Sequence, residues 1–205
     1  MRCIIKKISD FSENDYAFFV SCIPELHKKI SNMVFYEDRL RSASGYYLAK
    51  KMIAEESKYQ INDLVISADR FKKPFMINCP LHFNISHSFE YVACAVDYYD
   101  IGIDIERIRR YSPYDLKYYC SEAESAYIQE PKEIHEREKR FCDVWTFKEA
   151  FQKLRGFEAT DYKSISMQDY SNITAREYLD DYVFTICSDN MDFHRRKQHV
   201  FLFAE

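Results

Sequence analysis

The sequence predicts an α+β fold made of two similar halves, and three observations support this. Glu37–Lys58 and Glu136–Leu154 have the length and apolar spacing of amphipathic helices, and Gly156 ends the second one. Short apolar runs typical of strands follow each helix. The run Tyr91–Asp97 (YVACAVD) is echoed by Tyr182–Asp189 (YVFTICSD). An internal repeat with halves at 1–100 and 101–205 is therefore predicted, although a coincidence between two ordinary apolar strands would give the same echo.

Turn residues and local spacing predict the remaining elements. A helical region interrupted by Pro24 is expected over 11–35, and another over 111–129 after Pro113. Phe71–Pro74 (FKKP) is expected to form a turn. Strands are expected at six segments, namely 64–68, 91–97, 101–106, 163–167, 182–188 and 200–203.

Composition and charge exclude several classes of function. A net charge of −4 argues against nucleic acid or an anionic membrane surface as a partner. No stretch approaches the roughly 20 apolar residues of a membrane span, and no signal-peptide pattern is present. The seven cysteines are odd in number and contain no C-x-x-C pair, so reduced thiols and a cytoplasmic location are expected.

Two acidic residues, Asp104 and Glu106, lie two apart on the strand expected at 101–106. Both carboxylates then project from one face, while Ile103 and Ile105 point to the other. Two acids on one face repel each other unless a cation neutralises them, and Mg²⁺ is a natural oxygen-liganded partner. An edge strand with its polar face in water would show the same pattern.

The second long helix carries Trp145, Glu149 and Lys153 at spacings of four, so they share one helix face. A Glu–Lys pair at this spacing is usually a surface ion pair. Because this face also carries the only Trp, we expect it to be partly covered. Glu149 is then a candidate third acidic ligand, and Lys153 and Lys148 are candidates for holding phosphates.

A polar segment, Asn84–Ser88 (NISHS), precedes the strand at 91–97 and is expected to form a turn. Hydroxyl, imidazole and backbone N–H groups suit a phosphate contact. A plain polar turn with a solvated histidine is the alternative. His82 and His87 lack further ligands at a zinc-site spacing, so zinc is not expected.

Taken together, FNISHS at 83–88, GIDIE at 102–106 and WTFKEAFQK at 145–153 resemble the ordered signature of 4'-phosphopantetheinyl transferases. The resemblance covers about residues 28 to 167 and is closest to the larger, pseudo-dimeric bacterial type. It implies two similar subdomains related by a pseudo-two-fold, each a small sheet packed on a long helix, with the active site in the cleft between them. A monomer is then self-sufficient.

The resemblance also implies a reaction and a site. The phosphopantetheine group of coenzyme A would be transferred to a serine of an acyl or peptidyl carrier protein, as in nonribosomal peptide and polyketide synthesis, with release of 3',5'-ADP. Mg²⁺ would be held by Asp104, Glu106 and Glu149, with Glu149 as the catalytic base and Lys153 assisting the leaving phosphate. Contacts to coenzyme A are implied for eight residues: Lys28, Arg41, Lys73, Pro74, Ser86, His87, Lys148 and Lys153.

Departures from the family pattern and competing functions complete the expectations. The family usually has glycine where this chain has Lys72, and Glu124 is expected to be structural at most. A docking patch for the carrier is expected at Arg107, Arg109 and Arg110, unless this is a solvated basic turn. A Mg²⁺-dependent phosphohydrolase of coenzyme A or nucleotides, and a non-catalytic relative that binds carrier proteins, are the alternative functions.

Overall fold

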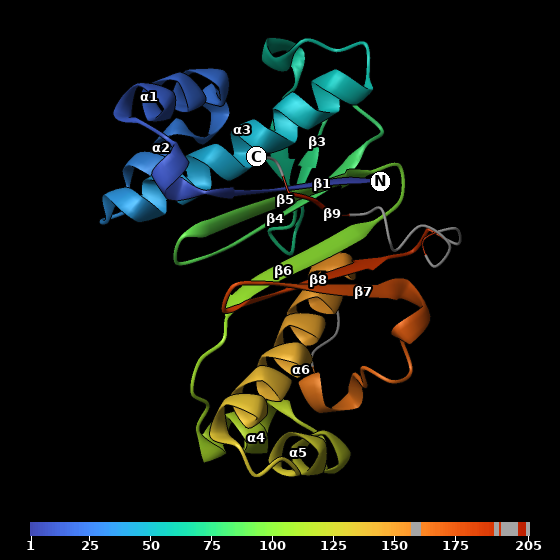
Figure 1. Cartoon of the computed structure of the whole chain (residues 1–205). Coiled ribbons are helices and arrows are strands. Elements are labelled where there is room, and N and C mark those ends of the chain that lie inside the picture. The colour runs from blue at the N-terminus through green and yellow to red at the C-terminus, as the bar shows by residue number, and fades with distance from the viewer. Residues whose placement is uncertain (157–160, 191–192, 194–200, 204–205) are drawn as a thin grey trace.

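The computed structural model describes residues 1–156, 161–190, 193 and 201–203, and its fold is α+β. One sheet has the order β4-β5-β1-β9 and carries α3; another has the order β6-β8-β7 and carries α6 (Figure 1). The first sheet comprises β1 (Arg2–Lys7), β4 (His82–Ser88), β5 (Tyr91–Asp97) and β9 (Phe201–Phe203). The second comprises β6 (Ile101–Arg107), β7 (Thr174–Leu179) and β8 (Tyr182–Ser188).

Helices and a small hairpin surround these sheets. The long helices are α3 (Tyr36–Glu56) and α6 (Ile134–Leu154). The shorter elements are α1 (Glu13–Cys22), α2 (His27–Ser31), α4 (Pro113–Tyr119), α5 (Glu122–Gln129) and the hairpin of β2 (Ile66–Ala68) and β3 (Pro74–Met76). Short 3₁₀ turns occupy Ile8–Asp10, Pro24–Leu26, Ile61–Asp63, Tyr162–Ser164 and Ser171–Ile173. Among the described residues, no helix is both long enough and apolar enough to cross a bilayer.

The two halves share one order of elements. In each, a first strand leads through helices to a helix of 21 residues. An antiparallel pair of strands follows, and its second strand lies in the middle, next to the first strand of that half. These middle strands are β5 and β8, which are the two segments that echo each other in sequence.

Most predicted elements are present, and three predictions are wrong. The segment 84–88 is part of strand β4, which pairs antiparallel with β5, and not a turn. The segment 111–129 forms two helices, because Ser121 begins α5 with its own capping box. The segment 163–167 is not a strand: Tyr162–Ser164 is a 3₁₀ turn, and the Lys148 ammonium binds the carbonyls of Tyr162 and Ile165.

Strands β1 and β7 were not predicted. Both border an apolar strand, and β1 (RCIIKK) reads as an ordinary charged segment at the start of the chain. The last predicted strand, 200–203, appears as Phe201–Phe203, whose backbone runs parallel to β1 in the sheet of the first half.

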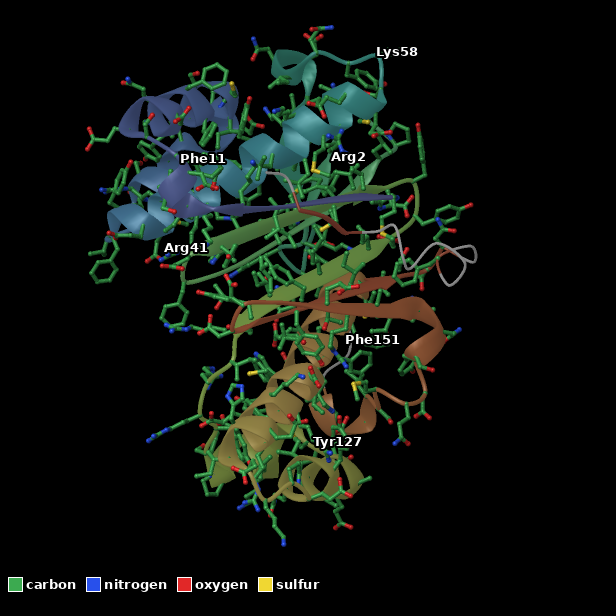
Figure 2. The ribbon with its side chains drawn as sticks, viewed as in Figure 1. Arg2, Phe11, Arg41, Lys58, Tyr127 and Phe151 are labelled. Carbon is green, nitrogen blue, oxygen red and sulfur yellow. The ribbon has the colours of Figure 1, made fainter. Side chains whose placement is uncertain are left out.

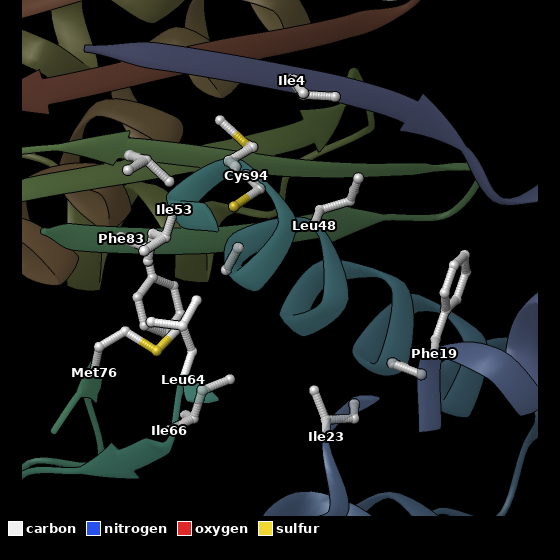
Figure 3. Packing of buried hydrophobic residues seen from close by; sticks show 14 of the residues in the cluster. Ile4, Phe19, Ile23, Leu48, Ile53, Leu64, Ile66, Met76, Phe83 and Cys94 are labelled. Carbon is white, nitrogen blue, oxygen red and sulfur yellow. The ribbon is translucent and has the colours of Figure 1, made fainter. Parts of the chain in front are cut away.

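Apolar side chains fill the space between α3 and the first sheet, between the two sheets, and between the second sheet and α6, where Phe147 and Ala150 pack with Cys187. The first core lies between α3 and the four-stranded sheet and includes Phe19, Leu48, Ile53 and Phe83 (Figure 3). A second core lies between the two sheets, where Ile5 of β1 packs in one cluster with Ile103 of β6 and Ile186 of β8. Since Ile101, Ile103 and Ile105 all face this core, the alternate residues of β6 must face α6.

Gly102 sets the distance between β6 and α6. A Cβ atom at this position would lie 2.0 Å from the Ala150 carbonyl oxygen and 2.4 Å from the Leu154 nitrogen. Only glycine therefore lets the helix come this close to the strand. The close approach brings the last two turns of α6 over the polar face of β6.

Polar side chains join β4 to β6, in what we call the β4–β6 seam. Every second side chain of β4 accepts a hydrogen bond from a backbone N–H of β6: Asn84 from Ile103 (3.0 Å), Ser86 from Ile105 (3.3 Å) and Ser88 from Arg107 (3.3 Å). The period of two that is intrinsic to strands places all three acceptors on one side of β4. The two halves are therefore linked by side chains.

Candidate functional site

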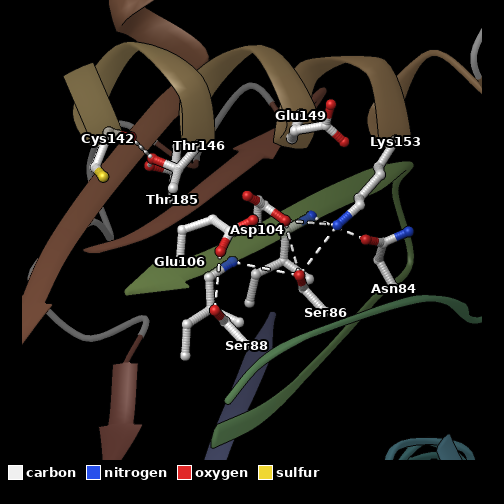
Figure 4. Close-up of polar contacts among 12 residues, drawn as sticks. Asn84, Ser86, Ser88, Asp104, Glu106, Cys142, Thr146, Glu149, Lys153 and Thr185 are labelled. Atoms are coloured by element: carbon white, nitrogen blue, oxygen red, sulfur yellow. Dashed lines mark hydrogen bonds and ion pairs between the residues drawn. The ribbon is translucent and has the colours of Figure 1, made fainter. Parts of the chain in front are cut away.

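Three carboxylates gather where α6 crosses the polar face of β6. Asp104 and Glu106 project from β6, and Glu149 projects from α6 one turn before Lys153 (Figure 4). Burial raises the pKa of both Glu106 and Glu149, and the negative charge of Asp104 raises each of them further. The sequence predicted that these acids, which come from two distant segments, hold one cation, and this stays a prediction.

Asp104 has two differently satisfied oxygens. Its Oδ1 accepts hydrogen bonds from the Lys153 ammonium at 2.6 Å and from the Ser86 hydroxyl at 2.7 Å. Lys153 also donates to Ser86 Oγ at 3.0 Å. The Oδ2 atom of Asp104 is buried and has no hydrogen-bond partner in the described part of the chain. A buried carboxylate oxygen without a partner is costly, so this position suits a ligand or a cation.

The other two carboxylates each have one hydroxyl partner. Ser88 donates to Glu106 Oε2 at 2.8 Å, and Tyr162 donates to Glu149 Oε1 at 2.7 Å. Burial, followed by the negative charge of Asp104, raises the pKa of Glu106. Burial also raises the pKa of Glu149, against a lowering effect of the Tyr162 hydrogen bond. Mutual repulsion of this kind is relieved by a cation.

The donor set fits a hard divalent cation. Carboxylate oxygens are the ligands that Mg²⁺ prefers, and one or two of them suffice when phosphates complete the shell. Within the described ranges, however, no three His, Cys, Asp or Glu side chains already stand close enough to form a ready-made metal site. The unpartnered Asp104 Oδ2 is therefore the feature that argues for a cation here.

A cavity of about 250 Å³ adjoins the carboxylates and is strongly basic. Its basic lining residues are Lys29, Lys72, Lys73, His87 and Lys153. The other lining residues are Met33, Ser42, Tyr46, Pro74, Asn84 and Ile85, so none of the described residues that line it is acidic. Lys73 and Lys153 each form an ion pair with a carboxylate behind the wall, and Lys29 and Lys72 add two further cations, so the wall itself suits a polyanion. Lys153 belongs both to this cavity and to the carboxylate group.

His87 faces this cavity from β4. Its pKa lies below its ordinary value, first because neighbouring protein partly desolvates the imidazole, although the residue is exposed, and then because Arg41 and Lys153 are cationic. A neutral imidazole can both donate and accept a hydrogen bond. The predicted contact of His87 with a phosphate group is thus consistent with its place. Ser86 is the residue before it on the same strand, and its hydroxyl is directed to Asp104.

The turn at 71–74 brings two lysines to the cavity. Asp69 Oδ1 accepts from the backbone N–H groups of Phe71 and Lys73, which closes the turn. Lys72 has φ +68°, a left-handed conformation that favours glycine. This is the position at which the resembling family usually has glycine, so Lys72 adds a cation at the expense of backbone strain. Lys73 Nζ donates to Asp100 at 3.1 Å and to the Leu154 carbonyl at 2.9 Å.

Four of the eight predicted coenzyme A contacts do not line the cavity, namely Lys28, Arg41, Ser86 and Lys148. Arg41 donates to the Phe89 carbonyl at 2.6 Å and to Asp38 at 2.6 Å, beside the β4–β5 turn (Figure 2). Lys28 is exposed on α2 and does not line the cavity, whereas its neighbour Lys29 does. Adjacent residues of a helix point about 100° apart, so Lys29 can face the cavity while Lys28 points to solvent.

The prediction for Lys148 is wrong. Its side chain is fully buried, and its ammonium forms an ion pair with Glu124 at 2.8 Å. It also donates to the Ile165 carbonyl at 2.8 Å. These partners occupy the ammonium on a different side of α6 from Lys153, so Lys148 does not reach the basic cavity. Glu124 has the structural role that the sequence suggested.

Some site residues were not predicted. Lys29, Tyr46 and Lys72 line the cavity, and Tyr162 binds Glu149. No motif marks them, because isolated lysines and tyrosines occur throughout this sequence. The one available signal was at Lys72, where the departure from the glycine of the family pattern places an extra positive charge.

Among the other cavities of the described chain, one lies next to this site and one lies far from it. One of about 360 Å³ shares Lys73 and Pro74 with the basic cavity and extends to His82 and Asp100. The other, of about 610 Å³, lies among α4, α5 and α6 and contains none of the predicted catalytic, metal-binding or coenzyme A residues. Its lining residues are Arg110, Tyr111, Pro113, Leu116, Gln129, Ile134, Arg137 and Glu138.

Comparison with known proteins agrees with the motifs. The sequence model of the 4'-phosphopantetheinyl transferase superfamily matches residues 100–200, and that described as 4'-phosphopantetheinyl transferase, N-terminal, matches residues 10–98. The chain is 33% identical to 4'-phosphopantetheinyl transferase Sfp of Bacillus subtilis (strain 168), over 71% of this chain and 65% of that protein. It is 32% identical to 4'-phosphopantetheinyl transferase gsp of Aneurinibacillus migulanus, over 58% of this chain and 50% of that protein.

A cyanobacterial relative, 4'-phosphopantetheinyl transferase HetI of Nostoc sp., is 33% identical over 57% of this chain and 48% of its own length. The matches to these three relatives thus span between 48% and 65% of their lengths. The two family matches together cover both halves of the fold, and the match to residues 100–200 includes Asp104, Glu149 and Lys153. The chain belongs to the 4'-phosphopantetheinyl transferase superfamily.

Proposed function

We propose that this protein transfers the 4'-phosphopantetheine group of coenzyme A to a serine hydroxyl of an acyl or peptidyl carrier protein. The observation that carries the proposal is that Lys153 connects the basic cavity with the carboxylate group. Its ammonium lies in the wall of a cavity with four lysines and binds the buried carboxylate of Asp104 at 2.6 Å. A diphosphate in that cavity would lie beside the carboxylates, as transfer from a diphosphate requires.

Asp104, Glu106 and Glu149 would hold one Mg²⁺. When bound, this ion would neutralise the diphosphate charge and the charge that develops during transfer. The support is the unpartnered Asp104 Oδ2 together with the raised pKa values of Glu106 and Glu149.

The side chains of this chain would then have separate roles. The carrier serine Oγ forms a bond to the β-phosphorus, the bond to the oxygen of 3',5'-ADP breaks, and the serine proton passes to Glu149. A buried carboxylate whose pKa is raised is a better base than an exposed one. Lys153 stabilises the charge of the leaving phosphate. Lys29, Lys72, Lys73, Ser86 and His87 bind the phosphates of coenzyme A, and Pro74 borders the nucleotide.

The shared order of elements in the two halves supports a pseudo-dimer with subdomains at 1–100 and 101–205. Under this proposal the coenzyme A cleft lies between the halves, next to the β4–β6 seam, and one chain is self-sufficient as a monomer. All seven cysteines are unpaired, which favours a reducing, cytoplasmic compartment.

The carrier protein would dock near the basic residues that follow β6. Arg110 is 95% exposed and borders the apolar groove of about 610 Å³. Arg107 pairs with Asp181 at 2.6 Å and Arg109 lies over the Phe141 ring. Arg110 lies 3.9 Å from Glu138 but is almost fully exposed, so it is the most available of the three. An acidic carrier surface suits this arrangement.

Intact-mass spectrometry of apo carrier proteins after incubation with coenzyme A and Mg²⁺ tests the reaction. We expect one added phosphopantetheine group and an equal amount of 3',5'-ADP. Coenzyme A that is cleaved at the same rate without any carrier would instead establish the phosphohydrolase. A panel of fatty-acid, polyketide and peptide-synthetase carriers that all remain unmodified, with coenzyme A intact, would contradict the proposal.

A charge-removal pair links the reaction to the site. Lys153→Met should reduce transfer by about 10²- to 10³-fold, since it removes a cation at the developing charge. Lys139→Met removes a lysine from the same helix, where it lies over the Tyr178 ring, and should leave transfer unchanged. Equal transfer rates for both variants would show that Lys153 takes no part in the reaction.

A further inference from the structure

Tyr162 is fixed against the carboxylate of Glu149. Its hydroxyl donates to Glu149 Oε1 at 2.7 Å. Its ring stacks on Trp145, with centroids 5.8 Å apart and planes 7° apart, and meets the edge of Tyr119 at 5.4 Å. The tyrosine thus has little freedom to turn, and its hydroxyl has a defined direction toward one carboxylate oxygen.

A buried clamp holds the backbone that carries Tyr162. Lys148 Nζ binds the carbonyl of Tyr162 at 2.5 Å and the carbonyl of Ile165 at 2.8 Å. The same ammonium pairs with Glu124 on α5 at 2.8 Å, and Lys148 is fully buried. A buried lysine would be costly without these partners. Lys148 and Glu149 are adjacent on α6, so the clamp and the carboxylate share one helix turn.

We propose that Tyr162 is a positioning residue for Glu149 and that the Lys148–Glu124 clamp holds it in place. This inference rests on the proposed function, in which Glu149 binds the divalent cation. By occupying Oε1, the phenol fixes the orientation of the carboxylate and leaves Oε2 directed to the cation. A hydrogen-bonded carboxylate loses less freedom when it binds a metal, and loss of such a partner typically weakens metal binding roughly 10- to 100-fold.

The contacts that run from Glu124 through Lys148 to the backbone of Tyr162 give the lysine at position 148 a structural role. Within the described residues, the segment 162–165 pairs with no strand; its 3₁₀ turn, the packing of Ile165 and the ammonium that binds its carbonyls hold it in place. Without the clamp, only the ring contacts with Trp145 and Tyr119 would hold the hydroxyl of Tyr162 near Glu149. Lys148 would then affect metal binding through Tyr162 alone.

Binding of Mn²⁺ in the presence of coenzyme A, followed by electron paramagnetic resonance, tests the inference independently of transfer. Tyr162→Phe removes only the hydroxyl and should raise the Kd for Mn²⁺ roughly 10- to 100-fold. Tyr170→Phe removes a hydroxyl from a ring packed on Phe151 of the same helix, outside the site, and should leave the Kd unchanged. Urea unfolding of each variant shows whether the fold is retained.

A double-mutant cycle tests the clamp. Lys148→Met combined with Glu124→Gln should weaken Mn²⁺ binding in the native background and have little further effect in the Tyr162→Phe background. If Tyr162→Phe binds Mn²⁺ as tightly as the native protein does, the inference is overturned, while the proposed transfer stands on its mass assay. If the native protein binds no Mn²⁺ with coenzyme A, the metal site and the inference both fail. If the clamp variant does not fold, the result for Tyr162→Phe decides.

Discussion

Lys153 and Asp104 form an ion pair of 2.6 Å between the last turn of α6 and the middle of β6. The pair is unequal, because the Asp104 side chain is 5% exposed and the Lys153 side chain 18%. The lysine therefore has one side toward the basic cavity while the aspartate remains covered. The Lys153–Asp104 pair therefore joins the basic cavity to the carboxylate group, and the Lys153 ammonium still contributes positive charge to the cavity.

Asp104→Asn should abolish most transfer and retain the fold. The substitution keeps an oxygen for Lys153 and Ser86 but removes the charge that a divalent cation needs. We expect a loss of about 10²-fold or more in kcat/KM and a change in unfolding free energy below about 2 kcal/mol. Mass-spectrometric rates and urea unfolding measure the two quantities. A folded variant with native rates would refute the assignment of Asp104.

Lys72→Gly should separate stability from affinity. Glycine tolerates φ +68° without strain, so unfolding free energy should rise by up to about 1 kcal/mol. Loss of an exposed cation from the cavity should raise the KM for coenzyme A by about two- to fivefold. Lys72→Ala keeps the strain and serves as the control, since it should raise the KM without the gain in stability. A lower KM for either variant would show that Lys72 does not face the ligand.

Gly102→Ala should be strongly destabilising. Its Cβ would meet backbone atoms of α6 at 2.0 and 2.4 Å, and backbone cannot move aside without shifting the helix. We expect a loss of about 3 kcal/mol or more in chemical unfolding. Gly45→Ala is the matched control: its nearest atom is a side-chain methyl of Ile85 at 2.6 Å, so its cost should be smaller. Equal costs would mean that the α6–β6 contact adapts freely.

His87 should make the protein less stable at acid pH than a variant without it. Its pKa is lowered in the folded state, so the unfolded chain takes up the proton first as pH falls through the ordinary value near 6.5. The stability of the native protein relative to His87→Gln should therefore decrease between pH 8 and pH 5. Urea unfolding at both values measures this difference. A relative stability that is unchanged or increases toward pH 5 would contradict the lowered pKa.

Cys79 should be the fast-reacting thiol of the native protein. It is half-buried, whereas the other six cysteines are buried. Burial also raises the pKa of Cys3 and Cys187 to about 12 and that of Cys120 and Cys142 to about 11, which suppresses their thiolates. Titration with a thiol reagent should show one rapid equivalent, and Cys79→Ser should remove it. Several rapid equivalents would indicate local opening of the core.

The sequence predicted the features that depend on period and on motif. Both long helices and strands β5, β6 and β8 follow from apolar spacing, and the facing of Asp104 toward α6 follows from the alternation along β6. Strand β4 was missed because its polar residues are buried by partners on β6, and a partner in another half cannot be read from local sequence.

The errors within the site have a similar cause. Lys148 and Lys153 both lie on α6 and have the same chemistry, yet their surroundings differ completely. What separates them is the position of α5 and of the turn at 162–164, which is a matter of tertiary packing. Lys28 and Lys29 differ by only one step along a helix. Spacing along the chain therefore indicated which residue types form the site, but could not choose among adjacent lysines.

The β4–β6 seam has a consequence for how the catalytic centre comes into being. Ser86 and Ser88 each accept a backbone N–H of β6 and donate to a carboxylate on that strand, so one set of hydroxyls both fastens the halves and orients the acids. Neither half alone contains all the residues that form the proposed catalytic centre. Suppose the polypeptide were cut in the short connection between Asp97 and Ile101. The two fragments would then be active only when they associate, so the rate of transfer would measure their association.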